Sequence, residues 1–211
     1  MATSFAPFGT LVDADLPDDP ATVVGRELLD RGVALPDDWD AAYRERHVDA
    51  PDDAEVPLPA HVSAALASRD VDAPGNAARR AVVAAFDPAV ETRAGAVEAV
   101  EAAAERGPVG LLADCAVPEL VGRTLVRSDL SRTDFDAVVT SVACGWRKPD
   151  RRAFEALAHR LDAPAGALTH VGADSETDGG IVDAGGEFRD VNERSLPALA
   201  ATWRDDARGR P

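Results

Sequence analysis

The sequence predicts an α/β fold: a parallel sheet with helices on both faces, and an inserted subdomain made only of helices. From residue 92 onward, apolar runs typical of buried strands alternate with segments of helical periodicity, which indicates a Rossmann-like core. Residues 15–90 contain several helical segments and no good strand. An apolar run within 3–12 precedes them and is expected to join the sheet. The helical region is therefore an insertion after the first strand.

The N-terminal elements follow from spacing and from turn signals. The strand within 3–12 ends in a Gly-Thr loop. A helix is expected over 21–32, because apolar residues recur there at helical spacing, Asp19 or Thr22 can cap its start, and Gly32 can end it. Further segments are expected as helices at 38–47, 59–69 and 76–86, with a loop at 48–59.

The C-terminal elements alternate. Helices are expected at 92–107, at 118–127 and after Lys148, and strands at 109–115, 135–144, 167–173 and 186–191. Gly107 suits a helix end, while Pro149 and Asp150 suit a first helical turn. The expected domains are therefore an α/β core, residues 1–14 and 91–211, and a helical cap, residues 15–90.

The composition is strongly acidic. The chain has 38 acidic and 22 basic residues, a formal net charge of -16, and 26 Asp among its acids. All basic residues but one are Arg, and only 5% of the residues are aromatic. This is the composition expected in a salt-rich cytoplasm, where carboxylates keep the surface hydrated. Such a surface repels phosphate backbones and offers no basic stripe, which argues against a nucleic-acid partner.

Other broad classes are also disfavoured. No segment approaches the ~20 apolar residues of a membrane span, and the N-terminus lacks the features of a signal peptide. Cys115 and Cys144 are too few for a disulfide framework and suit buried thiols in a reducing compartment. We therefore expect a cytoplasmic protein with no membrane partner. Its oligomeric state is left open.

The stretch 144–180 carries the candidate site. Lys148, the only lysine of the chain, stands at the front of a predicted helix. Asp174 and Asp178 follow the predicted strand 167–173. An ammonium at a helix start, followed ~25 residues later by carboxylates at a strand end, indicates a phosphate and metal site.

Four segments resemble, in order, the motifs of the haloacid dehalogenase-like (HAD) hydrolase superfamily with a small helical cap. FAPFGTLVD resembles the first motif, usually FDxxGTLVD, and GLLADCAVPEL the second, a strand ending in Ser or Thr. WRKPD resembles the lysine motif, and HVGADSETDGG the acidic fourth motif, usually VGD followed by a second acid. The resemblance covers nearly the whole chain and places the site at the carboxyl ends of the strands.

The resemblance implies phosphatase or dehalogenase chemistry. In that family a first-strand carboxylate attacks phosphorus or carbon and forms a covalent aspartyl intermediate. The acid two residues later, where present, passes a proton to the leaving group. A second-motif hydroxyl and the lysine hold phosphoryl oxygens, and carboxylates of motifs one and four hold Mg²⁺. The retained positions are Lys148 for catalysis, Gly9, Thr10, Asp114 and Lys148 for the ligand, and Asp174 and Asp178 for a weakened Mg²⁺ site.

The sequence departs from these motifs at the reacting positions. Ala6 stands at the nucleophile position, Phe8 at the acid/base position, Ala113 at the hydroxyl position and Ala173 at the first acid of motif four. We therefore expect a catalytically impaired HAD-like protein that acts as a binding or regulatory module for a small phosphorylated or acidic metabolite.

Several alternatives stay open. The protein is an active hydrolase if a displaced carboxylate such as Asp13 or Asp174 replaces the nucleophile, or a structural partner if it acts only through its cap. Lys148 either binds phosphate or neutralises Asp174 or Asp178. Asp178 either holds a cation or caps a helix that starts near Gly179.

Overall fold

The structure, a computed structural model, describes residues 1–208 and contains a five-stranded parallel sheet. Its strands, in spatial order, are β5 (Ala137–Thr140), β4 (Val109–Ala113), β1 (Ala2–Phe5), β6 (Leu168–Gly172) and β7 (Glu187–Asp190). Every neighbouring pair runs parallel. The predicted α/β class is confirmed. Because β1 is central, the chain turns from it to β4 and β5 on one side and to β6 and β7 on the other.

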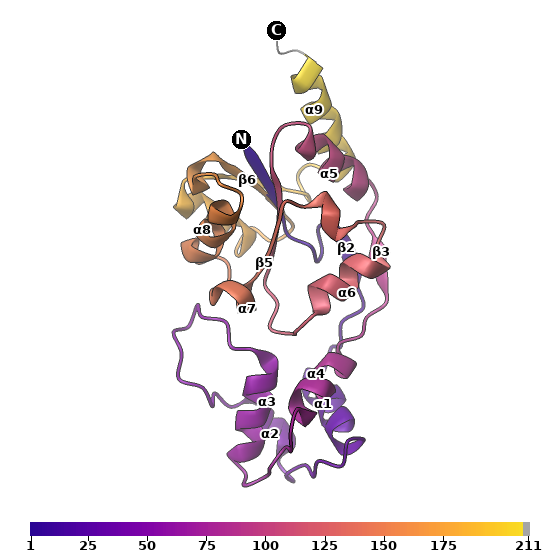
Figure 1. The fold of residues 1–211 in the computed structure, drawn as a ribbon, viewed down its shortest axis with the longest axis vertical. Helices are drawn as coiled ribbons and strands as arrows, with labels where there is room; N and C mark the ends of the chain where they lie inside the picture. Colours follow the sequence, from indigo (N-terminus) through magenta and orange to yellow (C-terminus); the bar gives the residue numbers. More distant parts are fainter. Residues whose placement is uncertain (209–211) are drawn as a thin grey trace.

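The strands are apolar because helices cover both faces of the sheet. Successive strand residues point to opposite faces, so Leu111 and Leu112 belong to two different hydrophobic clusters. One face packs against α5 (Ala96–Ala104), α6 (Leu120–Arg127) and α9 (Leu196–Arg208), and the other against α8 (Arg151–Arg160). Figure 1 shows α5 and α9 at one side of the sheet and α8 at the other.

Helix α9 is absent from the expected elements, which end at residue 191. It buries Leu196, Leu199 and Trp203 on one side. The Trp203 ring meets Phe5 of β1 edge-on, with 6.3 Å between the centroids. The shorter helical segments are α7 (Ser141–Cys144), η1 (Arg132–Asp134), η2 (Ala165–Ala167) and η3 (Asp178–Ala184).

The helices α1 (Pro20–Leu29), α2 (Trp39–Arg44), α3 (Leu58–Ala67) and α4 (Ala77–Ala85) form a separate group at the lower end of Figure 1. The Asp19 side chain caps α1 by accepting from the Thr22 amide at 3.3 Å, as expected. The apolar sides of these helices continue one of the two core clusters. We call these four helices the cap, after the helical insertion expected there; their apolar sides and the core share one hydrophobic cluster.

Two short strands join the cap to the core. β2 (Val12–Ala14) pairs antiparallel with β3 (Val90–Thr92), beside the expected boundaries at 14 and 90. Two expected boundaries are wrong because this stem takes their residues. The strand expected within 3–12 ends at Phe5, and the helix expected over 92–107 begins only at Ala96. The β-branched residues of β2 and β3 suit a ladder, but three-residue strands are too short to show a period.

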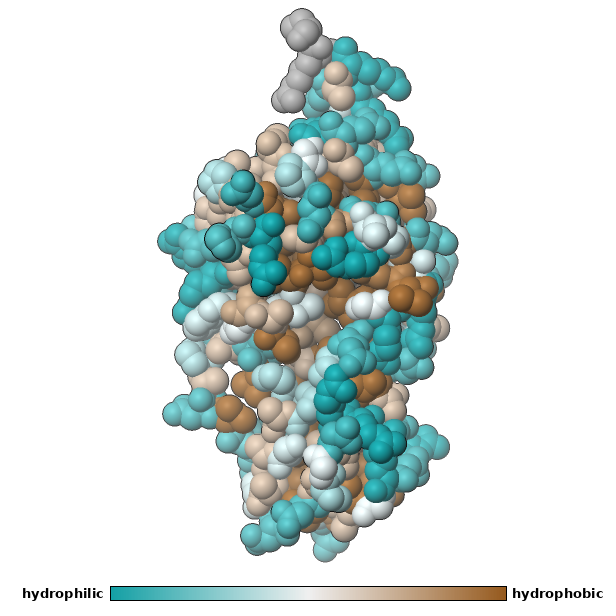
Figure 2. Space-filling model, in the orientation of Figure 1, coloured by the Kyte–Doolittle hydropathy of each residue, from teal (hydrophilic) through white to brown (hydrophobic). Residues whose placement is uncertain are grey.

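The residues between α2 and α3, 45–57, form a long loop that we call the strap. In Figure 1 the strap leaves the cap and rises to α7 of the core. Figure 2 shows hydrophilic residues spread over both the core and the cap on the face that it draws. No helix within residues 1–208 is long and apolar enough to cross a membrane.

Candidate functional site

The carboxyl ends of β4, β1 and β6 bring the motif positions together. These strands are neighbours, and Phe5 at the end of β1 lies between Leu111 and Val171. The residues that follow the strand ends therefore meet at one edge of the sheet, where ligands bind in such folds. We call this edge the strand-end site, and it contains Ala6, Ala113, Asp114, Lys148, Ala173, Asp174 and Asp178.

Three methyl groups occupy the positions where the motifs carry oxygen atoms. Ala6 and Ala113 are buried, and the Ala6 amide donates to the carbonyl of Val171 at 2.9 Å. Gly9 has φ = +69°, and a Cβ built there lies 3.8 Å from that of Ala173, so the Gly-Thr loop lies against the third alanine. The reacting positions are thus close together and carry no carboxylate or hydroxyl.

Two other residues of the first loop are turned into the protein. Phe8 is half-buried and packs against the hydrophobic core. Thr10 is fully buried, and its Oγ1 has no hydrogen-bond partner within the described part of the chain. An unpaired buried hydroxyl is costly, which marks this loop as a place where a further polar group would be stabilising.

Lys148 is held inside the site rather than pointing to solvent. Its ammonium forms an ion pair with Oδ1 of Asp178, and both side chains are 5% exposed. Its backbone N–H donates to Oδ1 of Asp114 at 3.0 Å. Of the two partners expected for Lys148, the structure pairs it with Asp178. Asp150 caps the following helix α8 by accepting from the Arg152 amide at 2.8 Å.

Both oxygens of the Asp178 carboxylate accept hydrogen bonds from groups of this protein. Its Oδ2 accepts from the amides of Ala173 at 3.0 Å and Asp174 at 3.1 Å. Its Oδ1 faces Lys148 and, at 3.3 Å, Nε2 of His170. Asp178 is the first residue of η3 but makes no capping bond to it, so of the two alternatives left open for Asp178 the structure does not show the helix cap. It instead ties the acidic loop to β6 and to the lysine.

His170 and Ser4, paired on the neighbouring strands β6 and β1, extend this ion pair. The Ser4 hydroxyl lies 2.7 Å from Nδ1 of His170, and the imidazole packs edge-on against Phe154. With Ser4 donating to Nδ1, the neutral imidazole donates from Nε2 to Asp178. A buried chain of four polar side chains therefore runs from Ser4 through His170 and Asp178 to Lys148.

The pKa values of this chain are shifted by burial and by its own bonds. Burial lowers the pKa of His170 to about 4, so the imidazole is neutral near pH 7. Burial by itself raises the pKa of Asp178. The hydrogen bond from His170 and the charge of Lys148 together outweigh it and hold that pKa below its usual value. Within this chain of four side chains, the Lys148 ammonium and the Asp178 carboxylate therefore neutralise each other.

This shift predicts acid sensitivity from His170. The unfolded chain takes up a proton at His170 below pH ~6.5 and the folded protein only below pH ~4, so the free energy of unfolding falls as pH falls through this window, by up to about 3 kcal/mol. Chemical denaturation between pH 7 and 4 measures the slope. His170→Gln should show a shallower slope, and the exposed control His159→Gln should keep the native one. Identical slopes in all three proteins contradict this prediction.

Both oxygens of the Asp174 carboxylate accept hydrogen bonds from the loop that contains Asp174. Its Oδ1 accepts from the Glu176 amide at 2.9 Å and its Oδ2 from the Thr177 hydroxyl at 3.0 Å. Asp13 lies outside the strand-end site, on the stem strand β2, where its exposed carboxylate is 3.8 Å from Nε of Arg93. In this structure Asp13 therefore lies outside the strand-end site, whereas Asp174 lies within it with both carboxylate oxygens bonded in its own loop.

The donor set does not suit a hard cation. Mg²⁺ prefers octahedral oxygen ligands, with carboxylates among them. Here Ala6 and Ala173 offer methyl groups, and the ammonium of Lys148 already neutralises Asp178. Within residues 1–208, no three His, Cys, Asp or Glu side chains are grouped to hold a metal ion.

No protein-family model matches the sequence, and no curated protein matches it. Solved structures do match. A haloacid dehalogenase-like family hydrolase from Xanthomonas campestris gives a TM-score of 0.58 at 17% identity, over 98% of this chain and 93% of that one. CbbY from Rhodobacter sphaeroides, in complex with phosphate, gives 0.57 at 16% identity, over 89% and 84%. YfnB from Bacillus subtilis, a putative HAD-hydrolase bound to magnesium, gives 0.54 at 16%, over 97% of both chains.

These matches define the class of the fold. Over most of its length the chain has the fold of HAD-like hydrolases, so the resemblance stated from the motifs is confirmed at the level of the fold. At 15–19% identity the likeness concerns the fold and leaves the chemistry to the residues of this chain.

Sequence reasoning missed four side chains around the site, which form two pairs. Ser4 and His170 are 166 residues apart, and their contact depends on the pairing of β1 with β6. Glu55 of the strap and Ser141 of α7 are 86 residues apart. The only local signals were a histidine inside an apolar strand and a glutamate inside a proline-rich loop.

Proposed function

We propose that this chain is a HAD-fold binding or regulatory module, which holds a small phosphorylated or acidic ligand at the strand-end site without hydrolysing it. The observation that carries the proposal is Ala6 at the end of β1. A methyl group has no electron pair to attack phosphorus or carbon, so the covalent aspartyl route is closed at its first step. The methyl groups of Ala113 and Ala173 remove support for the same step.

Two features support a role in binding. Lys148 supplies a cation within the site, and the Thr10 hydroxyl is buried without a partner among the described residues of the adjacent loop and core. Among the similar folds, CbbY is solved with phosphate, and a mutant of it with xylulose-(1,5)bisphosphate. Because Lys148 is already paired with Asp178, its net attraction for a dianion is smaller than that of a free ammonium. We therefore infer weak to moderate affinity.

We propose that the Mg²⁺ site is weakened, since magnesium is present in the similar structure of YfnB but the carboxylate positions here are partly alanine. The melting temperature should then change by less than about 1 °C between EDTA and about 10 mM Mg²⁺ at constant ionic strength. A variant carrying Ala6→Asp and Ala173→Asp should acquire a Mg²⁺-dependent rise, because both carboxylates are restored. A marked rise in the unmodified chain contradicts the weakening.

Thermal shift with phenylphosphonate, an ester analogue that cannot be hydrolysed, tests ligand binding. The expected result is a rise in melting temperature that grows with concentration, since a ligand of the folded state stabilises it by RT ln(1 + [L]/Kd). Benzenesulfonate at equal ionic strength controls for general anion effects. No rise with phenylphosphonate argues against a ligand site and favours the structural role of the cap.

A further inference from the structure

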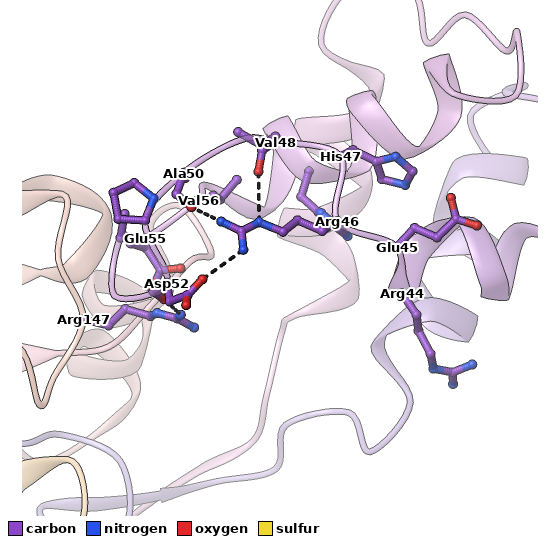
Figure 3. A pocket seen from close by; sticks show the side chains of 13 residues that line it. Arg44, Glu45, Arg46, His47, Val48, Ala50, Asp52, Glu55, Val56 and Arg147 are labelled. Atoms are coloured by element: carbon purple, nitrogen blue, oxygen red, sulfur yellow. Dashed lines mark hydrogen bonds and ion pairs between the residues drawn. The ribbon is translucent and has the colours of Figure 1, made fainter.

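Hydrogen bonds within the strap hold part of it in a defined conformation. Figure 3 shows the Arg46 guanidinium reaching across the strap to three acceptors, the carbonyls of Val48 and Ala50 and the carboxylate of Asp52. A pocket of about 370 Å³ lies between the strap and the ends of α2 and α3, with Arg147 of the core on its border. Arg46 thus holds residues 46–52 in one shape as they approach the core.

The far end of the strap is bonded to the core beside the strand-end site. The Arg147 amide donates to the carbonyl of Asp53 at 2.9 Å, and the Arg147 guanidinium donates to that of Asp52 at 2.6 Å. The Glu55 amide donates to the carbonyl of Gly145 at 3.0 Å. The core residues involved immediately precede Lys148, so the strap is fixed against the segment that positions the lysine.

One side chain of the strap enters the site itself. Oε2 of Glu55 accepts from the hydroxyl of Ser141 at 2.6 Å, and the same hydroxyl accepts from the Cys115 amide at 2.8 Å. Ser141 is fully buried and directly follows Thr140, the residue of β5 that pairs with Ala113. Ser141 therefore places a hydroxyl next to the strand end where the second motif has lost its own.

The surroundings of Glu55 disfavour the charged form of its carboxylate. Burial raises the pKa of Glu55, and the charge of Asp114 raises it further, against the opposing hydrogen bond from Ser141 and the charge of Arg147. Burial likewise raises the pKa of Asp114, which is half-buried in the same site. The Ser141 hydroxyl is the side-chain donor that this carboxylate has here, and the charge of Arg147 adds to its support.

We propose that the Ser141 hydroxyl binds the anionic group of the ligand. In the unliganded protein the Glu55 carboxylate of the strap accepts the hydrogen bond from this hydroxyl and so competes with the ligand. This proposal rests on the proposed function, because it concerns the same site. A phosphoryl oxygen can replace Oε2 as the acceptor of the Ser141 hydroxyl, while the Cys115 amide keeps its bond to the serine oxygen. The ligand must displace Glu55, since two anions on one donor repel each other.

Calorimetric titration with phenylphosphonate tests this competition. Glu55→Ala and Glu55→Gln should each tighten binding by about tenfold, because the competing charge is gone. Asp49→Asn is the matched control: it removes one negative charge from an exposed position of the same strap, and we expect less than about a twofold change. Ser141→Ala should weaken binding, and adding Glu55→Ala to it should restore nothing. Melting temperatures confirm that each variant is folded.

The outcomes separate the two proposals. Binding that tightens equally in Glu55→Gln and Asp49→Asn reflects net charge alone and overturns the role of Glu55. Binding that Ser141→Ala leaves unchanged overturns the role of Ser141. In both cases the proposed function stands. Absence of binding in the unmodified chain and in every variant overturns the proposed function, and the competition with it.

Discussion

Replacing Lys148 with methionine is expected to lower the free energy of unfolding by about 3–5 kcal/mol, the range seen when one partner of a buried ion pair is removed. The substitution leaves the Asp178 carboxylate buried, with two backbone amides and a neutral imidazole as its only donors within the described residues. Chemical denaturation at pH 7 measures the loss. Because methionine matches the lysine stem in volume, a packing defect contributes little.

Two further variants identify the cause. Arg44→Met removes one partner of an exposed i,i+4 pair with Asp40 and should cost less than about 1 kcal/mol. Adding Asp178→Asn to Lys148→Met should recover part of the loss, since the uncompensated charge disappears while an acceptor for the two amides remains. If Lys148→Met costs no more than Arg44→Met, the ion pair is not a central part of the fold.

The second large effect is a gain of activity. The triple variant Ala6→Asp, Ala113→Ser, Ala173→Asp returns the nucleophile, the phosphoryl-binding hydroxyl and one metal ligand to the strand-end site. With Mg²⁺ and 4-nitrophenyl phosphate in high salt, its turnover should exceed that of the unmodified chain by at least about 10²-fold. This is a minimum for the rate that a nucleophile and its supporting groups contribute.

The matched control carries Ala6→Asn with the other two replacements. Asparagine fills the same space as aspartate but forms no acyl phosphate, so this protein should be silent. Turnover in the asparagine control shows that another residue attacks and contradicts the assignment of Ala6. The melting temperature of both variants shows whether the restored oxygens are tolerated at positions that are buried in this structure.

Elements whose apolar residues recur at a regular spacing could be predicted from the sequence. Elements that depend on contacts between distant residues could not. Buried strands such as β4 and β6 are marked by apolar runs, and α1 and α8 by caps at Asp19 and Asp150. The stem strands β2 and β3 have three residues each, too few to distinguish alternation from chance. They pair with each other, although the whole cap lies between them in the sequence.

The candidate site shows the same division. The alanine positions follow from local motif spacing, and the structure places them at neighbouring strand ends. The choice of Asp178 over Asp174 as partner of Lys148 depends on how the acidic loop folds. A Cβ built on Gly172 would overlap Oδ2 of Asp178, so glycine there allows the carboxylate to turn inward. Such a close approach leaves no periodic signal in the sequence.

The central proposal is that this chain, which has a HAD-like fold, does not hydrolyse phosphate esters, and the rate of the unmodified chain tests it most directly. The measurement is 4-nitrophenyl phosphate hydrolysis with Mg²⁺ in high salt, at high protein concentration, beside the triple variant. We predict a rate equal to that of the buffer for the unmodified chain and clear turnover for the triple variant. Turnover by the unmodified chain comparable with that of the triple variant contradicts the account.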